Sequence, residues 1–217
     1  KNYGYRSIMR NSSKYIFVTG APGSKWSSVC KNIYFSSSVN RSDYTEDRTY
    51  YHSAWGEPKL MHLGAYFDPG MEFGDWFDNI SLHTKEQCEA EFNRPFPMQR
   101  GTKIIKSHVF AYNISYLREH WPDCPIVLVH RNNDACLGWW VRCGEFNITY
   151  PTYNKYYKNL KQMGSEINRQ NSSIKEALKI AKPVTDNVHL ARVCNIKPPA
   201  NKYNQNYYQD NITVSVI

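Results

Sequence analysis

Apolar residues form short continuous runs along the chain, and segments with helical periodicity lie between these runs. Three runs rich in β-branched or aromatic residues predict buried strands, at residues 15–19, 103–106 and 125–130. Apolar residues three or four positions apart predict helices at residues 24–35, 84–93, 111–120, 134–143, 152–164, 172–182 and 185–195. Asp134 is the expected N-cap of the helix that runs to Cys143.

Weaker patterns describe the remaining segments. Residues 59–63 and 212–216 are interpreted as short strands, the second at a sheet edge. Residues 1–13 are interpreted as a frayed lead-in, and residues 36–58 as a long loop or lid. The Gly- and aromatic-rich segment 64–78 is interpreted as a satellite hydrophobic cluster, with the wall of a ligand pocket as the alternative.

Strands that alternate with helices are typical of βαβ units. The sequence therefore predicts an α/β fold in three layers, with a mostly parallel sheet flanked by helices. It contains no internal repeat and no composition shift that would mark a boundary. We expect one domain over residues 1–217.

Charge narrows the range of ligands. The chain has 27 basic and 19 acidic side chains, a net charge of +8, which suits a nucleotide, a nucleic acid or an anionic glycan. No block of five or more Lys or Arg occurs, so a dedicated nucleic-acid-binding tail is not indicated. A merely basic, solvated surface explains the charge equally well.

Cysteine spacing and hydropathy exclude several further classes. The six cysteines include no C-x-x-C pair, so neither a zinc ribbon nor a thioredoxin-like site is indicated, and we expect buried, reduced thiols. No apolar run reaches the length of a membrane span. We expect a soluble protein of the cytoplasm, with the lumenal domain of a truncated anchored protein as the alternative.

The segment after the first predicted strand carries the strongest chemical signal. A strand that runs through a Gly- and Pro-containing turn into a helix presents backbone N–H groups and the positive end of the helix dipole to an anion. The candidate residues are Gly20, Ala21, Pro22, Gly23, Ser24, Lys25, Trp26 and Ser27. This is not a Walker A loop, which has four residues between its glycines and a glycine directly before its lysine. An ordinary turn with an exposed lysine is the alternative.

Two further strand ends bring polar residues to the same predicted edge, where ligands bind in such sheets. Lys106 and His108 end the second strand, and a histidine there can accept a proton near neutral pH. Arg131 follows the third strand, and its guanidinium fits a phosphate group. The alternatives are a core or capping histidine and a surface arginine.

Together, these segments resemble the sulfotransferases that use 3′-phosphoadenosine 5′-phosphosulfate. The stretch Thr19-Gly-Ala-Pro-Gly-Ser-Lys-Trp-Ser27 is similar to that family's T-x-P-K-S-G-T-T-W or G-x-P-R-S-G-T-S loop. Lys106-Ser-His108 is similar to its K-T-H, and Leu128-Val-His-Arg-Asn132 to the start of its R-[DN]-P segment. The resemblance covers about residues 15–145. The cation of the loop stands at Lys25, two positions later than in the family, where Gly23 takes its place.

The resemblance implies a P-loop NTPase-like sulfotransferase fold and a metal-free reaction. A sulfuryl group would pass from the nucleotide donor to a hydroxyl or amine of a carbohydrate or small molecule. His108 would be the base, Lys25 and Lys106 would stabilise developing charge, and the loop with Arg131 would bind the donor. The loop 36–58 and the aromatic segment would shape the acceptor pocket, with His52 and His62 as candidate contacts.

Two other functions remain open at this point. A P-loop kinase-like phosphotransferase would need an acidic Mg²⁺ ligand at a strand end, and none of the predicted strands ends in Asp or Glu. A non-catalytic nucleic-acid or glycan binder would use the net charge and the many tyrosines. The sulfotransferase interpretation predicts neither a nucleic-acid partner nor a membrane segment.

Overall fold

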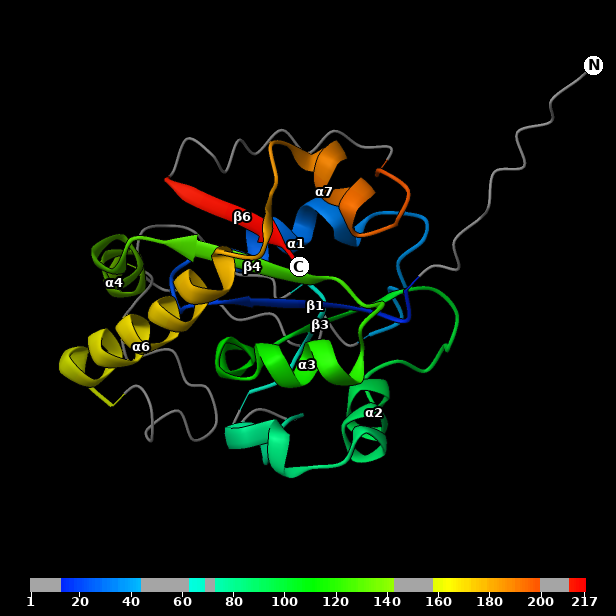
Figure 1. Ribbon diagram of the computed structural model, residues 1–217, viewed down its shortest axis with the longest axis horizontal. Helices are drawn as coiled ribbons and strands as arrows, with labels where there is room; N and C mark the ends of the chain where they lie inside the picture. Colours follow the sequence, from blue (N-terminus) through cyan, green and yellow to red (C-terminus); the bar gives the residue numbers. More distant parts are fainter. Residues whose placement is uncertain (1–12, 44–62, 69–72, 143–157, 200–210) are drawn as a thin grey trace, which may run out of the picture.

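The computed structural model describes residues 13–43, 63–68, 73–142, 158–199 and 211–217 (Figure 1). Its centre is a six-stranded sheet in the order β2-β3-β1-β4-β6-β5. The strands are β1 (Tyr15–Gly20), β2 (Ala65–Tyr66), β3 (Lys103–Lys106), β4 (Ile126–Arg131), β5 (Lys182–Pro183) and β6 (Ile212–Val216). All three strongly predicted strands are therefore confirmed.

The sheet is mostly parallel, as the alternation of strands and helices predicted. β1 pairs in parallel with β3 and β4, so Val18 lies opposite both Lys106 and Val127. β2 extends the parallel part beyond β3. The predicted strand at residues 212–216 is confirmed as β6, which runs antiparallel to β4 and β5. Because β6 lies between these two strands, its predicted place at a sheet edge is wrong.

The helices are α1 (Trp26–Tyr34), α2 (Lys85–Asn93), α3 (Ile114–His120), α4 (Asn133–Arg142), α6 (Leu160–Leu178) and α7 (Asn187–Val193). The 3₁₀ segments are η1 (Phe77–Leu82) and η2 (His108–Tyr112). The predicted helix at 111–120 thus begins later, at Ile114, because η2 occupies the residues before it. Asp134 lies in the first turn of α4 and is not its cap. The side chain of Asn132 accepts the backbone N–H of Asp134 instead.

One long helix replaces two that were predicted at 152–164 and 172–182. Buried Met163, Ile167 and Ile174 lie along one side of α6, and the buried polar residues Gln170 and Asn171 lie between them. The polar stretch that separates the two predicted helices is therefore part of one buried helix side. Lys182, the last residue of the second predicted helix, belongs instead to β5, which has only two residues, both of them exposed. Residues 152–157 lie outside the part of the chain that the structure describes.

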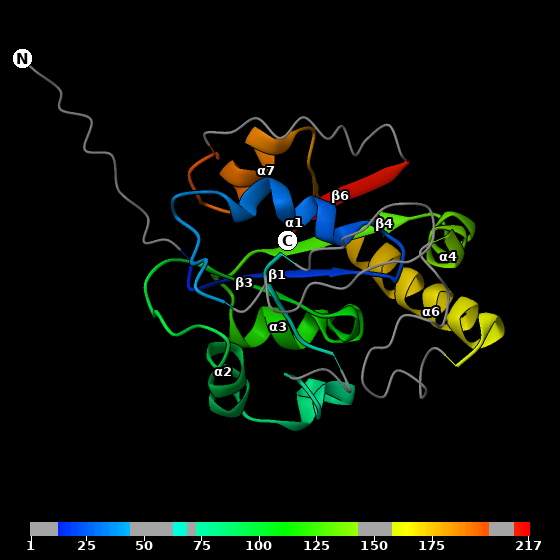
Figure 2. The ribbon, with the colours of Figure 1, turned by 180° about the vertical axis from the view of Figure 1, so that it is seen from behind.

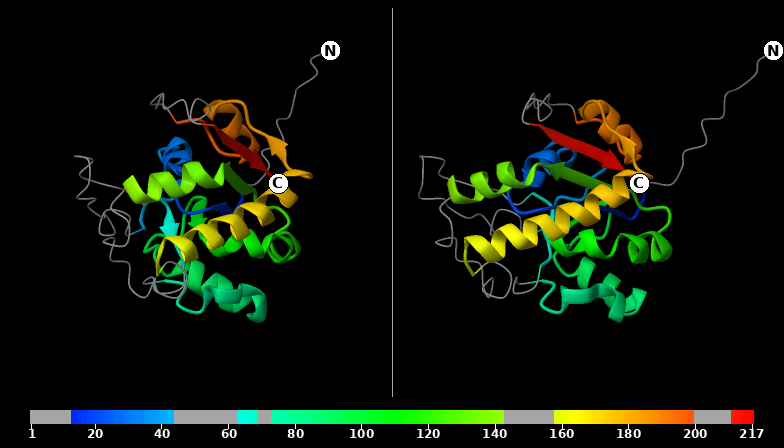
Figure 3. Two further views of the ribbon diagram at one scale, coloured as in Figure 1. Left: turned by 90° about the vertical axis from the view of Figure 1, so that its left-hand side faces the viewer. Right: turned by 60° about the vertical axis from the view of Figure 1, so that its left-hand side comes forward.

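Helices cover both faces of the sheet. α1 and α7 lie on one face, and α2 and α3 lie on the other (Figures 1 and 2). Side chains of β1 alternate between the two cores: Val18 packs on the α1 side, while Phe17 meets aromatic rings on the other side. α6 packs beside α4 and contributes to both cores (Figure 3).

The aromatic segment after β2 supplies much of the second core. Phe67, Phe73 and Phe77 are buried together with Phe92 and Phe110. The hydrophobic-cluster interpretation is therefore confirmed for these residues, as part of a main core rather than a satellite. Among the described helices, none is long and apolar enough to cross a membrane.

Candidate functional site

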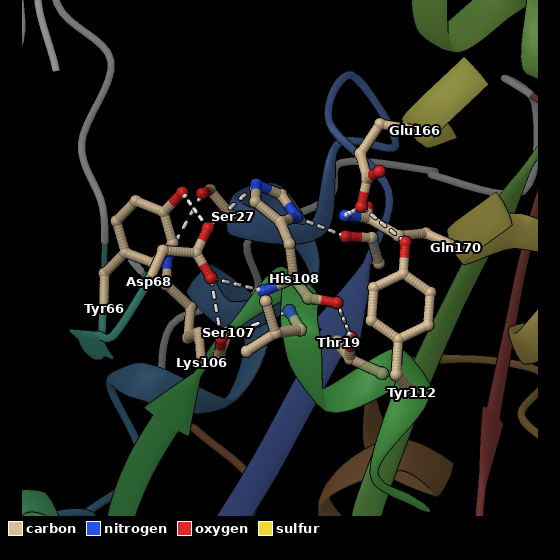
Figure 4. Close-up of polar contacts among 12 residues, drawn as sticks. Thr19, Ser27, Tyr66, Asp68, Lys106, Ser107, His108, Tyr112, Glu166 and Gln170 are labelled. Atoms are coloured by element: carbon tan, nitrogen blue, oxygen red, sulfur yellow. Dashed lines mark hydrogen bonds and ion pairs between the residues drawn. The ribbon is translucent and has the colours of Figure 1, made fainter. Parts of the chain in front are cut away.

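The carboxyl ends of β1, β3 and β4 meet at one edge of the sheet and bring the predicted loop, Lys106, His108 and Arg131 together (Figure 4 shows the part around His108). The loop begins directly after β1, and its turn closes through a hydrogen bond from the Ser24 N–H to the Ala21 carbonyl, 2.9 Å long. Parallel pairing therefore assembles residues that lie more than 100 positions apart in the sequence.

Gly23 determines how closely the loop packs on α4. Its φ of 79° lies in the left-handed region. A Cβ atom at this position would lie 2.1 Å from the carbonyl oxygen of Cys136 in α4. Only glycine therefore allows the loop to take this conformation against this helix.

The amino end of α1 lies beside this loop. Lys25 precedes the helix, has a φ of 64°, and provides no side-chain cap. Ser24 is completely buried, and its hydroxyl oxygen has no hydrogen-bond partner among the residues that the structure describes. The N-terminus of α1 therefore offers helix-dipole charge next to an unsatisfied hydroxyl, which suits an anionic group.

Lys25 and Lys106 make different contacts. The Lys25 ammonium lies 4.7 Å from the centre of the Trp139 ring in α4. Lys106 is completely buried, and its Nζ donates a 3.1 Å hydrogen bond to Ser27 Oγ. The Trp26 ring lies 4.9 Å from the same ammonium. The structure thus joins Lys106 to the first turn of α1, whereas Lys25 extends toward α4.

His108 is packed tightly against the loop. It is only 5 % exposed and stacks on Trp26, with 4.0 Å between ring centres. Its Nδ1 bonds to the carbonyl oxygen of Gly20. Because that oxygen can only accept, Nδ1 must carry the hydrogen, which leaves Nε2 as the basic nitrogen of the neutral ring.

Burial lowers the pKa of His108 below its ordinary value, although the nearby Asp68 carboxylate and the Gly20 carbonyl act in the opposite direction. The imidazole is therefore neutral near pH 7. A neutral ring with Nε2 unprotonated is the form that can accept a proton.

Asp68 is a residue of this site that the sequence did not reveal. It lies two positions after β2, is 2 % exposed, and accepts hydrogen bonds from Tyr66 OH (2.7 Å), Ser107 Oγ (2.6 Å) and the His108 N–H (2.9 Å). The sequence feature that could have identified Asp68 is its position directly after a short apolar run. The strand it follows has only two residues, too few to form a recognisable pattern.

Arg131 contacts the loop directly. Its Nη1 donates a 3.1 Å hydrogen bond to the Gly23 carbonyl, while its Nε is buried and finds no hydrogen-bond partner within the described part of the chain. On the other side, the Arg131 carbonyl accepts from the Asn171 side chain of α6, at 2.8 Å. The guanidinium is therefore held beside the loop and still has an unused donor.

A large concavity of about 1240 Å³ lies at the opposite end of the sheet, among residues that include Lys14, Trp121, Pro125, Lys182 and Ile217. These residues adjoin the amino ends of β1 and β4, far from the loop. The concavity is therefore separate from the candidate site.

Several predicted features lie outside the described residues. His52, His62, Cys143 and most of the loop 36–58 belong to this group. The cysteines within the described residues are free thiols, as expected, and burial raises the pKa of Cys30 to about 11. No cluster of three or more His, Cys, Asp or Glu side chains that could hold a metal occurs among the described residues.

The chain was compared with protein-family models, with curated proteins and with solved structures, and none of them matches it.

Proposed function

We propose that this protein is a sulfotransferase that uses 3′-phosphoadenosine 5′-phosphosulfate, on a P-loop-like sulfotransferase fold. One observation carries the proposal. The ends of two strands, β3 and β4, converge on the loop after β1, through contacts of His108 with Gly20, Lys106 with Ser27, and Arg131 with Gly23. The resemblance of these segments to sulfotransferase motifs in the same order supports the assignment.

The donor-binding groups would be those of the loop. The unpartnered hydroxyl of Ser24 and the N-terminus of α1 fit a phosphosulfate group, and the unused Nε of Arg131 fits a phosphate. These are buried polar atoms without partners in the described structure, which is the chemistry that an anionic nucleotide would satisfy. Backbone N–H groups from Gly23 to Trp26 would contribute further donors.

The chain's own groups can move the proton and balance the charge. Nε2 of His108 would accept the proton of the acceptor hydroxyl or amine. The Lys106 ammonium, next to the first turn of α1, would stabilise negative charge that develops on the donor phosphate. Lys25 would serve the same purpose after leaving Trp139.

Calorimetry with 3′-phosphoadenosine 5′-phosphate and with ATP tests the class. We expect binding of the first to be at least about tenfold tighter, because Arg131 would contact its 3′-phosphate, a group that ATP lacks. Arg131→Ala should remove this preference, while Arg118→Ala, at an exposed arginine of α3, should leave it unchanged. Equal or tighter binding of ATP would contradict the proposal, and so would full turnover of a radiolabelled donor by His108→Ala.

A phosphoryl-transfer enzyme is the second candidate, and Asp68 is the observation that favours it. None of the strands expected from the sequence ends in a carboxylate, yet Asp68 follows β2 and lies beside Lys106 and His108. Three donors already occupy the oxygens of Asp68, which makes it a poor Mg²⁺ ligand in this arrangement. An activity that requires Mg²⁺ and ATP would favour this candidate over the first.

A further inference from the structure

Asp68 and His108 face each other within the same buried cluster, although they follow different strands (Figure 4). Asp68 Oδ2 lies 3.9 Å from His108 Nε2, the nitrogen that is left basic by the bond from Nδ1 to Gly20. The imidazole is thus bounded by a backbone carbonyl on one side and a carboxylate on the other. The Trp26 ring stacks on the imidazole, and the Tyr66 ring meets it edge-on.

The carboxylate itself is held rigidly. Ser107 Oγ and the His108 N–H both donate to Oδ1, and Tyr66 OH donates to Oδ2. Because one of these donors is the backbone of His108, any movement of Asp68 would also move the histidine. The Gly20 carbonyl holds the ring through Nδ1, while Asp68 holds the backbone of His108 and places a negative charge near Nε2.

We propose that Asp68 is a positioning residue for His108: it holds the backbone of the histidine and stabilises the protonated form of the imidazole. The inference rests on the proposed function for the role of His108 as a base. In that reaction, the acceptor oxygen forms a bond to sulfur, and the bond from sulfur to the donor phosphate oxygen breaks. The electron pair of the broken bond stays on the phosphate. The acceptor proton moves to Nε2, and Asp68 remains an anion beside the new imidazolium.

The charges around His108 agree with this role. Asp68, after β2, and Glu166, on α6, favour the protonated ring, whereas Lys106, on β3, disfavours it. Asp68 has the larger effect of the two carboxylates, and it is the one that faces Nε2. Without Asp68, the buried imidazolium would lack its main counter-charge and would still face the positive charge of Lys106.

The test is the titration of His108 by ¹⁵N NMR in the ligand-free full chain, with the signal assigned by its loss in His108→Gln. We expect Asp68→Asn to lower the pKa of His108 by about one unit, because the counter-charge is removed. Asp75→Asn, at an exposed carboxylate of the same segment, should produce no shift. An unchanged titration in Asp68→Asn would overturn the proposal.

Tyr66→Phe provides a second variant in case Asp68→Asn does not fold. Loss of the tyrosine hydroxyl leaves Oδ2 without that donor, so its full charge faces the imidazole and the pKa of His108 should rise. A nonspecific loss of packing in the site would change the pKa of His108 in the same direction in both variants, not in opposite directions. A fall in the Tyr66→Phe variant would contradict the assignment.

Kinetics with the sulfate donor separate this inference from the proposed function. If the wild type transfers sulfate, Asp68→Asn should lower kcat about tenfold or more with KM nearly unchanged, and should move the acidic limb of the pH profile to lower pH. If the wild type neither binds nor uses the donor, the proposed function fails, while the NMR titration still decides whether Asp68 controls His108. Turnover with an unchanged acidic limb in Asp68→Asn would overturn the inference alone.

Discussion

The buried ammonium of Lys106 donates a 3.1 Å hydrogen bond to the hydroxyl of Ser27, which joins the end of β3 to the first turn of α1. A buried charge is costly unless polar partners surround it. The Ser27 hydroxyl therefore stabilises the folded protein as well as belonging to the candidate site. Its contact with Lys106 also holds α1 next to the strand that precedes His108.

Replacement of Ser27 should measure this contact. We expect Ser27→Ala to lower the free energy of unfolding by about 2 kcal/mol, because a charged buried donor loses an acceptor. Urea denaturation followed by circular dichroism would measure the change. Ser28→Ala, one position along α1 and only partly buried, should cost less than about 0.5 kcal/mol. Equal effects of the two variants would show that the bond contributes nothing specific.

The contact between the loop and α4 leads to a second prediction. Gly23→Ala should destabilise the protein by several kcal/mol, since the new Cβ would strain a positive φ and meet the Cys136 carbonyl at 2.1 Å. Gly138→Ala, in α4, meets nothing within 4 Å and should stabilise the helix by up to about 1 kcal/mol. Thermal unfolding of both variants checks the contrast. A stable Gly23→Ala protein would mean that the loop can move away from α4.

His130 gives a prediction for pH dependence. Burial lowers its pKa in the folded state, and Lys175 adds to the effect. The unfolded chain thus binds more protons than the folded one, so stability is lost as the pH falls below about 6.5. Urea denaturation at several pH values should show that acidification lowers the free energy of unfolding less in His130→Gln than in the wild type. His83→Gln, at a partly exposed histidine, serves as the control. The same loss in His130→Gln as in the wild type would exclude His130 as its source.

Lys25 leads to a prediction about activity. Under the proposed function, Lys25→Met should lower kcat about 100-fold, because a cation near the transferred group is removed. Its stability should change little, since the loop backbone is held by the Ala21–Ser24 turn and by Arg131. Lys31→Met, at the last turn of α1, is the matched control. A kcat equal to that of the wild type would remove Lys25 from the mechanism and leave Lys106 as the relevant cation.

The predictable part of the fold is the part with strong local patterns. β1 and most of β4 are buried apolar runs, and β3 is a buried pair of isoleucines between two lysines. α2 begins with a capping box at Thr84 and Gln87. β2 and β5 have two residues each and are defined by their neighbours in the sheet. The interior place of β6 depends on pairing with β5, a long-range contact that no local pattern reveals.

The candidate site divides in the same way. The loop, Lys106, His108 and Arg131 follow strong strands, so the sequence could place them at one edge. Asp68 follows a weak strand, and its partnership with His108 depends on β2 pairing beside β3. The direction of the Lys25 side chain could not be predicted from the sequence either, because it depends on the packing of α4 against the loop.

The register of β3 has a consequence for how such a site can change. Side chains alternate between the faces of a strand, so a one-residue shift of β3 against β1 would exchange Lys106 for a neighbour that points to the other core. A deletion within β3 would therefore remove the ammonium and displace His108 together. We expect the strands to tolerate conservative substitution but no change of length. New acceptor specificity would then arise through insertions in the loops, where extra residues leave the hydrogen-bonded pairing of the strands unchanged.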